Sequence, residues 1–206
     1  TGLVPLGDVD RAGYDSVALV TQSGTAAVSV QVLRGGSTVA DPTKTWAPLL
    51  AYTTPRRSGA GEVSLRVAAG DYDGDRRRDL AVISTVGVGG SPVNSRATVL
   101  RDVSSYLDRR LKDGFRADFG DLRAFSIDST AVTGVFDAVS MVDLDGDGLD
   151  DLVLGSSRAE VFNSGPDVAG AVARRREAGR LVILEGKRQV GANWSASGAE
   201  VARPIS

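Results

Sequence analysis

The chain contains no cysteine and no histidine among its 206 residues. These absences exclude disulfides, thiol nucleophiles, Cys/His zinc sites and any Ser-His-Asp triad. No apolar run reaches the roughly 18 residues that a membrane-spanning helix requires. The sequence therefore gives no sign of membrane insertion, and no catalytic constellation or organic cofactor site can be recognised in it.

Neither sign of charge dominates. The chain has 24 Lys and Arg against 26 Asp and Glu, a formal net charge of −2. This balance gives no general reason to expect binding to nucleic acid or to an anionic membrane surface. The length suits one or two ordinary domains with a substantial apolar core.

Aspartate is concentrated in two nine-residue segments, 71–79 (DYDGDRRRD) and 143–151 (DLDGDGLDD), at positions 1, 3, 5 and 9 of each. Alternate residues of a tight turn point their carboxylates toward a common centre, and Gly74 or Gly146 lets the chain bend there. Four carboxylates so close together repel one another unless a cation neutralises them. Because hard oxygen ligands suit a hard cation, each segment is predicted to bind Ca²⁺.

The residues beside these loops distinguish them from EF-hands. An EF-hand has a bidentate Glu at position 12, whereas the equivalent residues here are Val82 and Leu154, within the apolar runs 80–83 and 152–154. Such short, partly β-branched runs predict buried strands, and strands are also expected at 63–68 and 138–142. Each loop is therefore predicted to close a β-hairpin.

A third, degenerate copy of the loop begins at Asp8 and is followed by a predicted strand at 17–20. It keeps Asp8 and Asp10, but Ala12 stands at position 5 and Asp15 comes one residue early. Either this loop is a weaker calcium site, because lost ligand charge lowers affinity, or it is a tight turn stabilised by Asp side chains and Gly13. Another strand follows each hairpin, and these are expected at 28–33, 97–100 and 181–184.

The recurrence of the loop at residues 8, 71 and 143 predicts an all-β fold of three blade-like antiparallel sheets of a β-propeller, part of a larger ring. Short helices are expected as insertions, at 102–112 from its apolar spacing and at 166–177. The predicted boundaries are a first repeat at 1–62 with the degenerate loop, a second at 63–134, a third at 135–198, and the start of a further unit at 199–206.

The third repeat resembles the FG-GAP repeats of integrin alpha-subunit propellers and the related VCBS-type repeats of bacterial exported proteins. Residues 136–157 follow that family's order of Phe-Gly, strand, calcium loop, strand and Gly-Ala-Pro. Asp137 replaces the Gly of Phe-Gly, Ser156 and Ser157 replace Ala-Pro, and the second repeat has neither signature intact. The resemblance implies calcium ligands at positions 1, 3, 5 and 9 and a backbone carbonyl at position 7: Asp71, Asp73, Asp75, Arg77 (backbone) and Asp79 in one loop, and Asp143, Asp145, Asp147, Leu149 (backbone) and Asp151 in the other.

Several functions fit these features. The first is a calcium-stabilised propeller segment in extracellular adhesion or protein interaction, with a protein or glycan partner at the cell surface. The alternatives are a carbohydrate-binding propeller and an accessory module of an exported polysaccharide-active enzyme. Millimolar free calcium outside cells makes loops of moderate affinity useful there, so we expect a secreted or cell-surface, bacterial protein. The start at Thr1 is expected of a mature product or an excised fragment. The missing blades would come from the same longer chain, from a second copy or from another subunit.

Two arginine runs, 76–78 and 174–176, could contact an acidic partner. The simpler interpretation is that they are solvated, because charge runs in loops usually are. Trp46, Trp194, Tyr52 and Tyr106 could stack on a sugar, although scattered aromatic residues more often belong to the core.

Overall fold

The computed structural model describes residues 2–23, 27–36, 48–55, 63–88, 91–107, 109–112, 124–128, 135–157, 161–163, 173–175, 179–187 and 201–203. Over these residues the chain is all-β, with a single turn of 3-10 helix, η1 (Val103–Tyr106), and no α-helix. No helix of this part is long and apolar enough to cross a membrane.

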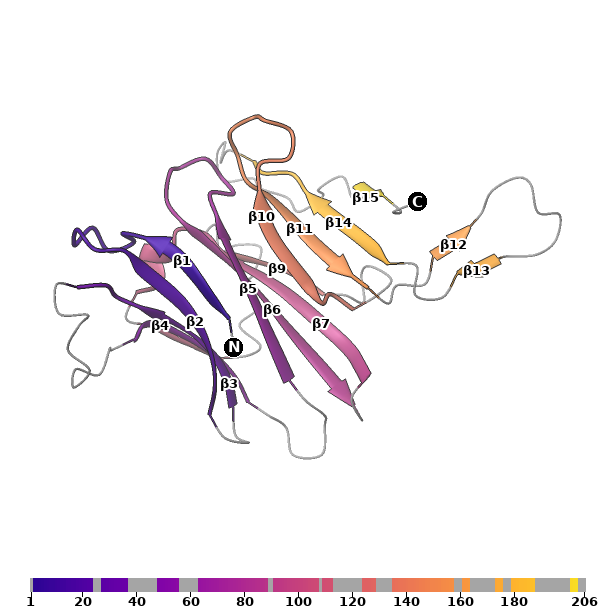
Figure 1. Cartoon of the computed structure of the whole chain (residues 1–206), viewed down its shortest axis with the longest axis horizontal. Helices are drawn as coiled ribbons and strands as arrows, with labels where there is room; N and C mark the ends of the chain where they lie inside the picture. The colour runs from indigo at the N-terminus through magenta and orange to yellow at the C-terminus, as the bar shows by residue number, and fades with distance from the viewer. Residues whose placement is uncertain are drawn as a thin grey trace.

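Three main sheets follow one another along the chain (Figure 1). The first contains β1 (Leu3–Gly7), β2 (Ser16–Ser23), β3 (Ala27–Leu33) and β4 (Pro48–Pro55). The second contains β5 (Val63–Gly70), β6 (Asp79–Val88), β7 (Ser91–Leu100) and β9 (Ala124–Asp128). The third contains β10 (Ala138–Val142), β11 (Asp151–Ser156), β14 (Arg180–Leu184) and β15 (Val201–Arg203). These four-stranded arrays are antiparallel throughout, each strand pairing with the next of its array.

Three short strands, β8 (Arg109–Lys112), β12 (Val161–Asn163) and β13 (Ala173–Arg175), lie outside these four-stranded arrays. β8 adds to the first sheet by pairing with β4 in parallel, although it lies within the second repeat of the sequence. β12 and β13 form a separate antiparallel ribbon. β15 pairs with β14 and so belongs to the third sheet, whereas the sequence boundary at residue 198 assigned it to a further unit.

The predicted strands beside and after the loops are confirmed, and loops 71–78 and 143–150 do close β-hairpins. The helix prediction for 102–112 is wrong. In 102–112, Val103 and Tyr106 are buried in one 3-10 turn, and residues 109–112 then extend along β4. The open edge of β4 offers backbone hydrogen bonds that outweigh the helical spacing of the side chains. Of the helix predicted at 166–177, residues 173–175 instead form β13 and pair with β12, and the rest of that segment lies outside the described residues.

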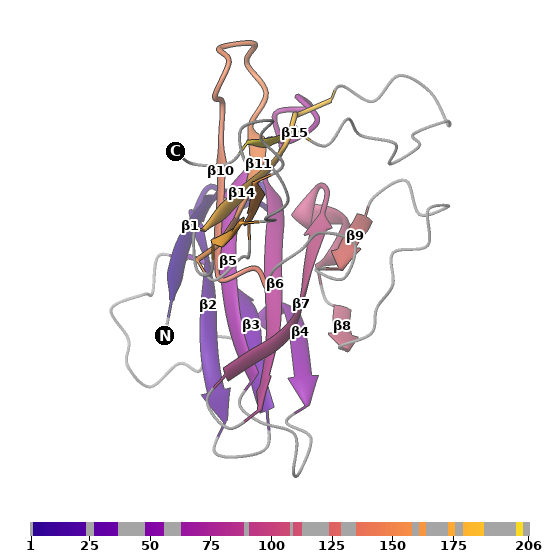
Figure 2. The ribbon, with the colours of Figure 1, turned by 90° about the vertical axis from the view of Figure 1, so that its right-hand side faces the viewer.

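The second sheet lies between the other two, and its faces alternate along each strand. Leu80 and Val82 of β6 join a core cluster with residues of the first sheet, such as Val30. Ala81 and Ile83 join a second cluster with residues of the third sheet. A strand covered on both faces reads as a continuous apolar run rather than an alternating one. The run 80–83 is therefore explained by the stacking of the sheets, which Figures 1 and 2 show from two sides.

Candidate metal centres

The three aspartate loops occupy the same place in the three sheets. Loops 8–15, 71–78 and 143–150 join the first two strands of each sheet and are of equal length, because the strand pairs that close them are Gly7↔Ser16, Gly70↔Asp79 and Val142↔Asp151. All three project from the same side of the stacked sheets (Figure 1). Because the loops have the same length and are closed by equivalent strand pairs, residues at the same position in each loop can be compared directly.

One hydrogen bond recurs in all three loops. The carboxylate Oδ2 at position 1 accepts the backbone N–H of position 6, from Arg76 to Asp71 at 2.9 Å, from Gly148 to Asp143 at 3.0 Å, and from Gly13 to Asp8 at 2.8 Å. Positions 4 and 6 also have positive φ in every loop. The residues concerned are Arg11 and Gly13, Gly74 and Arg76, and Gly146 and Gly148. The degenerate first loop therefore shares the backbone path of the two intact ones.

In the second repeat, the carboxylates of Asp71, Asp73 and Asp79 each offer an oxygen within 4.8 Å of the others. Asp73 and Asp79 are buried, and Asp71 Oδ1 is a buried oxygen for which no hydrogen-bond donor is found in the described part of the chain. Buried oxygens without a donor are unfavourable unless another positive partner is present. The donor set, three carboxylates converging with one oxygen left unsatisfied, fits a hard divalent cation.

The electrostatics of this cluster point the same way. Burial raises the pKa of Asp79 to about 7, although backbone N–H groups of Asp102 and Tyr72 oppose the shift. Burial also raises the pKa of Asp73, with a further contribution from the charge of Asp75. Ionising these carboxylates is costly without a nearby positive charge. Arg101 supplies one such charge, with its Nη1 3.7 Å from Asp73 Oδ2. A bound cation would favour the ionised form of each.

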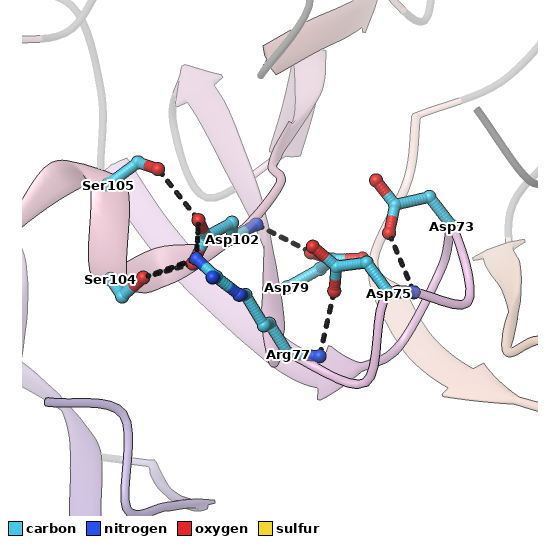
Figure 3. Close-up of polar contacts among 7 residues, drawn as sticks. All are labelled: Asp73, Asp75, Arg77, Asp79, Asp102, Ser104 and Ser105. Atoms are coloured by element: carbon cyan, nitrogen blue, oxygen red, sulfur yellow. Dashed lines mark hydrogen bonds and ion pairs between the residues drawn. The ribbon is translucent and has the colours of Figure 1, made fainter. Parts of the chain in front are cut away.

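The aspartate at position 9 also braces the loop. Asp79 Oδ2 accepts the N–H of Tyr72 and Asp79 Oδ1 accepts the N–H of Asp102, both at 2.7 Å. Figure 3 shows the second of these contacts beside the loop. Asp151 does the same in the third repeat, accepting the N–H groups of Leu144 at 3.1 Å and Gly186 at 2.9 Å. Position 9 thus ties each intact loop to the residues just after the third strand of its own sheet.

Asp102 is a second anchor in the second repeat. Its carboxylate accepts hydrogen bonds from Ser104, from Ser105 at 2.8 Å and from Arg77 Nη1 at 2.7 Å (Figure 3). Partial burial acts to raise the pKa of Asp102, but these three donors outweigh it, so the pKa lies below its ordinary value. Asp102 is therefore held as a carboxylate, and it fixes the side chain of Arg77.

In the third repeat, the residues that converge are Asp143, Asp145 and Asp147, at positions 1, 3 and 5. Asp143 Oδ1 accepts the N–H of Gly146 at 2.7 Å, and Asp147 Oδ1 accepts that of Leu149 at 2.8 Å. Asp145 and Asp147 are exposed, unlike the buried pair in the second repeat. Both clusters contain the aspartates at positions 1 and 3. The third member is the aspartate at position 9 in the second repeat and the one at position 5 in the third repeat.

The first loop lacks a comparable cluster. Among the described residues, the acidic groups close enough to hold a metal are those of the other two loops, and Asp8, Asp10 and Asp15 are not brought together. Asp10 is instead paired with Arg34 at 2.7 Å, and Asp15 is exposed. Position 9 is Ser16, whose buried Oγ has no hydrogen-bond partner in the described part of the chain. The geometry of the first loop supports a tight turn held by the Asp8 carboxylate, which accepts the N–H groups of Ala12 and Gly13.

The second and third loops are bonded directly to each other. The N–H of Asp71 donates to Asp150 Oδ2 at 2.7 Å, and the N–H of Asp150 donates to the carbonyl of Asp71 at 2.9 Å. The N–H of Lys187 donates to the carbonyl of Tyr72 at 3.0 Å. The candidate metal centre of the second repeat is therefore part of the junction between two sheets.

Sequence reasoning did not single out Asp102 and Asp150 as site residues. Asp102 follows a strand ending that is similar in all three repeats (VLRG, VLRD and ILEG), and that similarity was the available signal. Asp150 precedes the predicted ligand Asp151 but points to the neighbouring loop, which no local pattern reveals. Tyr106 is buried in the core between the first two sheets and is not available for sugar stacking. Trp46 and Trp194 lie outside the described residues, and nothing is described of the Tyr52 side chain.

Comparison with protein-family models, curated proteins and solved structures finds no match.

Proposed function

We propose that loops 71–79 and 143–151 each bind one Ca²⁺ and that the bound ions stabilise a stacked array of β-sheets acting outside the cell in a structural, adhesion or protein-interaction role. The observation that carries the proposal is the convergence of three carboxylates in each of two hairpin loops of equal length and equal closure. A solvated acidic turn could account for one such loop, but two with the same spacing and backbone path favour a common ligand.

The residues that would hold the ions are the aspartates at positions 1, 3, 5 and 9, with the backbone carbonyls of Arg77 and Leu149 at position 7. Oxygen donors in a flexible loop are what Ca²⁺ prefers. In the second repeat, the buried and unsatisfied Asp71 Oδ1 supports a cation directly. The ion supplies positive charge and coordination, while the chain supplies the braced loop.

The proposed effect of calcium is on the junctions between sheets. Asp71 belongs both to a carboxylate cluster and, through its backbone, to the bonds with Asp150 of the next loop. An ion that fixes Asp71 would therefore also hold the second sheet against the third. Because ligands that bind only the folded state stabilise it, calcium would contribute to the stability of the whole array.

We also propose that the three sheets are blades of a β-propeller whose ring is completed by further blades, from a longer chain, a second copy or another subunit. Stacking of the three main sheets in chain order supports this, while a usual propeller has about four to eight blades. Measuring the mass of the protein in solution tests how the ring is completed. A monodisperse species of single-chain mass would count against a ring built from copies or from another subunit.

Calcium titration by calorimetry of chelator-treated protein tests the metal sites. We expect about two ions per chain, with Asp73→Asn and Asp145→Asn each removing one. Asp15→Asn, an exposed change in the first loop, is the matched control and should leave both sites intact. Absence of calcium uptake by the wild type, or two remaining sites in both loop variants, would contradict the proposal.

A further inference from the structure

A pocket of about 270 Å³ lies between the first and second loops. Its charged lining residues come from three separate segments: Asp8 and Arg11 from the first loop, Arg76, Arg77 and Arg78 from the second, and Asp102 from the start of η1. The arginine run 76–78, unremarkable as a sequence, is thus brought against an arginine from the first loop. Four arginines and two aspartates line one small cavity.

Internal contacts account for only part of this charge. Asp102 is occupied by Arg77 and by Ser104 and Ser105. Asp8 accepts the backbone N–H groups of Ala12 and Gly13 within its own loop. Within the described part of the chain, the exposed side chains of Arg11, Arg76 and Arg78 have no hydrogen bond or ion pair. Three arginines that line the pocket therefore have side chains without an acceptor in the described part of the chain.

Backbone conformation marks the same pocket. Arg11, Arg76 and Asp102 are the non-glycine residues with positive φ in the described part of the chain, at 57°, 64° and 52°, and all three line it. At position 4, where the first loop has Arg11, the second and third loops have glycine. At position 6, where the second loop has Arg76, the first and third loops have glycine. Arginine thus stands where glycine avoids a conformational cost, and strained residues of this kind cluster at ligand sites.

The neighbouring junction shows what the pocket lacks. Between the second and third loops, the carboxylate of Asp150 at position 8 accepts the N–H of Asp71 at position 1. Between the first and second loops, position 8 is Arg78 and position 1 is Asp8, and both line the pocket. The Asp150 carboxylate therefore bridges the second and third loops, whereas Arg78 occupies the corresponding position between the first and second loops.

We propose that this pocket binds an oxyanion, a sulfate, phosphate or carboxylate group, held by Arg11, Arg76 and Arg78. The planar guanidinium fork suits such groups because it donates two parallel hydrogen bonds to a pair of oxygens. The volume lies just below the roughly 300–1,000 Å³ of pockets for drug-sized ligands, so it fits one anionic group or a single charged sugar of a longer chain. Arg76 and Arg78 belong to the second aspartate loop, but none of the three arginines is a proposed calcium ligand, and the anion site does not depend on calcium being the ligand of that loop.

Calorimetric titration at constant ionic strength tests the site with three probes: sodium sulfate and sodium glucuronate with calcium present, and sodium phosphate in chelator. We expect saturable binding of at least one probe, and the tightest of the three identifies the anion. Arg11→Gly and Arg76→Gly should each weaken it by about tenfold or more, since a charge-assisted hydrogen bond is lost. Glycine suits the positive φ at both positions, so these variants should retain the fold, as a melting curve would verify.

Lys187→Gln is the matched control, because it removes one exposed positive charge from the segment after β14, outside the pocket. It should bind the anion as the wild type does. The proposal is overturned if none of the three anions binds saturably, if both glycine variants bind as well as the wild type, or if the control loses as much affinity as they do. Calcium uptake by Arg11→Gly should be unchanged, because Arg11 lies in the first loop, outside the proposed calcium sites, and this measurement separates failure of the anion site from failure of the metal sites.

Discussion

At the scale of single residues, the aspartates of the loops are not equivalent. Position 1 carries the hydrogen bond common to all three loops, from the N–H of position 6. Position 9 braces the loop through two backbone N–H groups, as Asp79 and Asp151 show. The hydroxyl of Ser16, at position 9 of the first loop, has no hydrogen-bond partner in the described part of the chain. The first loop therefore keeps the turn without the long-range brace.

The buried carboxylate of Asp79 predicts an unusual pH dependence for the calcium-free protein. Its pKa is raised from 3.8 to about 7 by burial, so between these values the folded state binds more protons than the unfolded state. Stability then falls as pH rises through this window, because ionisation is disfavoured only in the folded chain. Asp73, whose pKa is also raised, adds to the same slope.

Urea unfolding in chelator between pH 5 and pH 8 measures this effect. The wild type should become less stable toward pH 8, and Asp79→Asn should be less stable overall but with a flatter profile. Calcium should restore the wild type chiefly at the higher pH, where the carboxylate is available as a ligand. An equally steep profile in the variant would show that Asp79 is not the responsible group.

At the scale of elements, the hairpins form locally but their junctions do not. Helical apolar spacing in 102–112 is overridden because β4 presents an open edge that residues 109–112 can pair with. Asp102, with its positive φ, turns the chain after β7 and lets Val103 and Tyr106 enter the core. A pattern along one segment contains no information about an edge that is about 60 residues away.

Gly70 provides an element-scale test of the junction between the second and third sheets. A Cβ at this position would lie 2.6 Å from Asp150 Oδ2 and 2.7 Å from Met141 Cβ. Gly70→Ala should therefore separate the two hairpins and destabilise the fold by about 1–3 kcal/mol, as overpacking typically does. Chemical denaturation with calcium present measures the loss.

Gly36→Ala is the control for that measurement, because a Cβ there would meet nothing within 4 Å and its φ is not positive. It should unfold at the wild-type denaturant concentration. Equal stability of Gly70→Ala and the control would mean that the two hairpins are not in contact as the bond from Asp71 to Asp150 requires.

At the scale of the whole molecule, the second sheet is held from both sides. One core cluster joins it to the first sheet and another joins it to the third. Between the second and third sheets, hydrogen bonds that involve the loops add to the core contacts. Between the first and second sheets, the arginine pocket lies at the loop end. Among the described residues, the first and third sheets each contribute to one core cluster, whereas the second sheet contributes to both. Val142 and Leu144 in the third repeat are exposed, where additional blades of the proposed ring would supply apolar cover.

Removal of calcium is the whole-molecule prediction. If the ions hold the loops and thereby the junctions, chelation should lower the melting temperature by several degrees and increase susceptibility to protease. Differential scanning calorimetry and limited proteolysis, each with and without chelator, measure these effects. The double variant Asp73→Asn with Asp145→Asn should melt at the same temperature in both buffers.

Metal analysis completes this experiment. If a chelator leaves melting and protease resistance unchanged while elemental analysis shows the protein to be free of metal, calcium has no stabilising role here. A melting shift that persists in the double variant would instead assign the effect of the chelator to some other site.

Sequence alone determined the hairpins, the flanking strands and the aspartate positions, because these depend on interactions within a few residues. The period of apolar side chains specifies a strand, and the spacing of Asp and Gly specifies a turn. Tertiary structure decided which carboxylates converge, the bond between Asp71 and Asp150, the pairing of β8 with β4, and the meeting of Arg11 with the run 76–78. Those features depend on how separate sheets stack, and stacking is set by the total fit of buried side chains rather than by any local spacing.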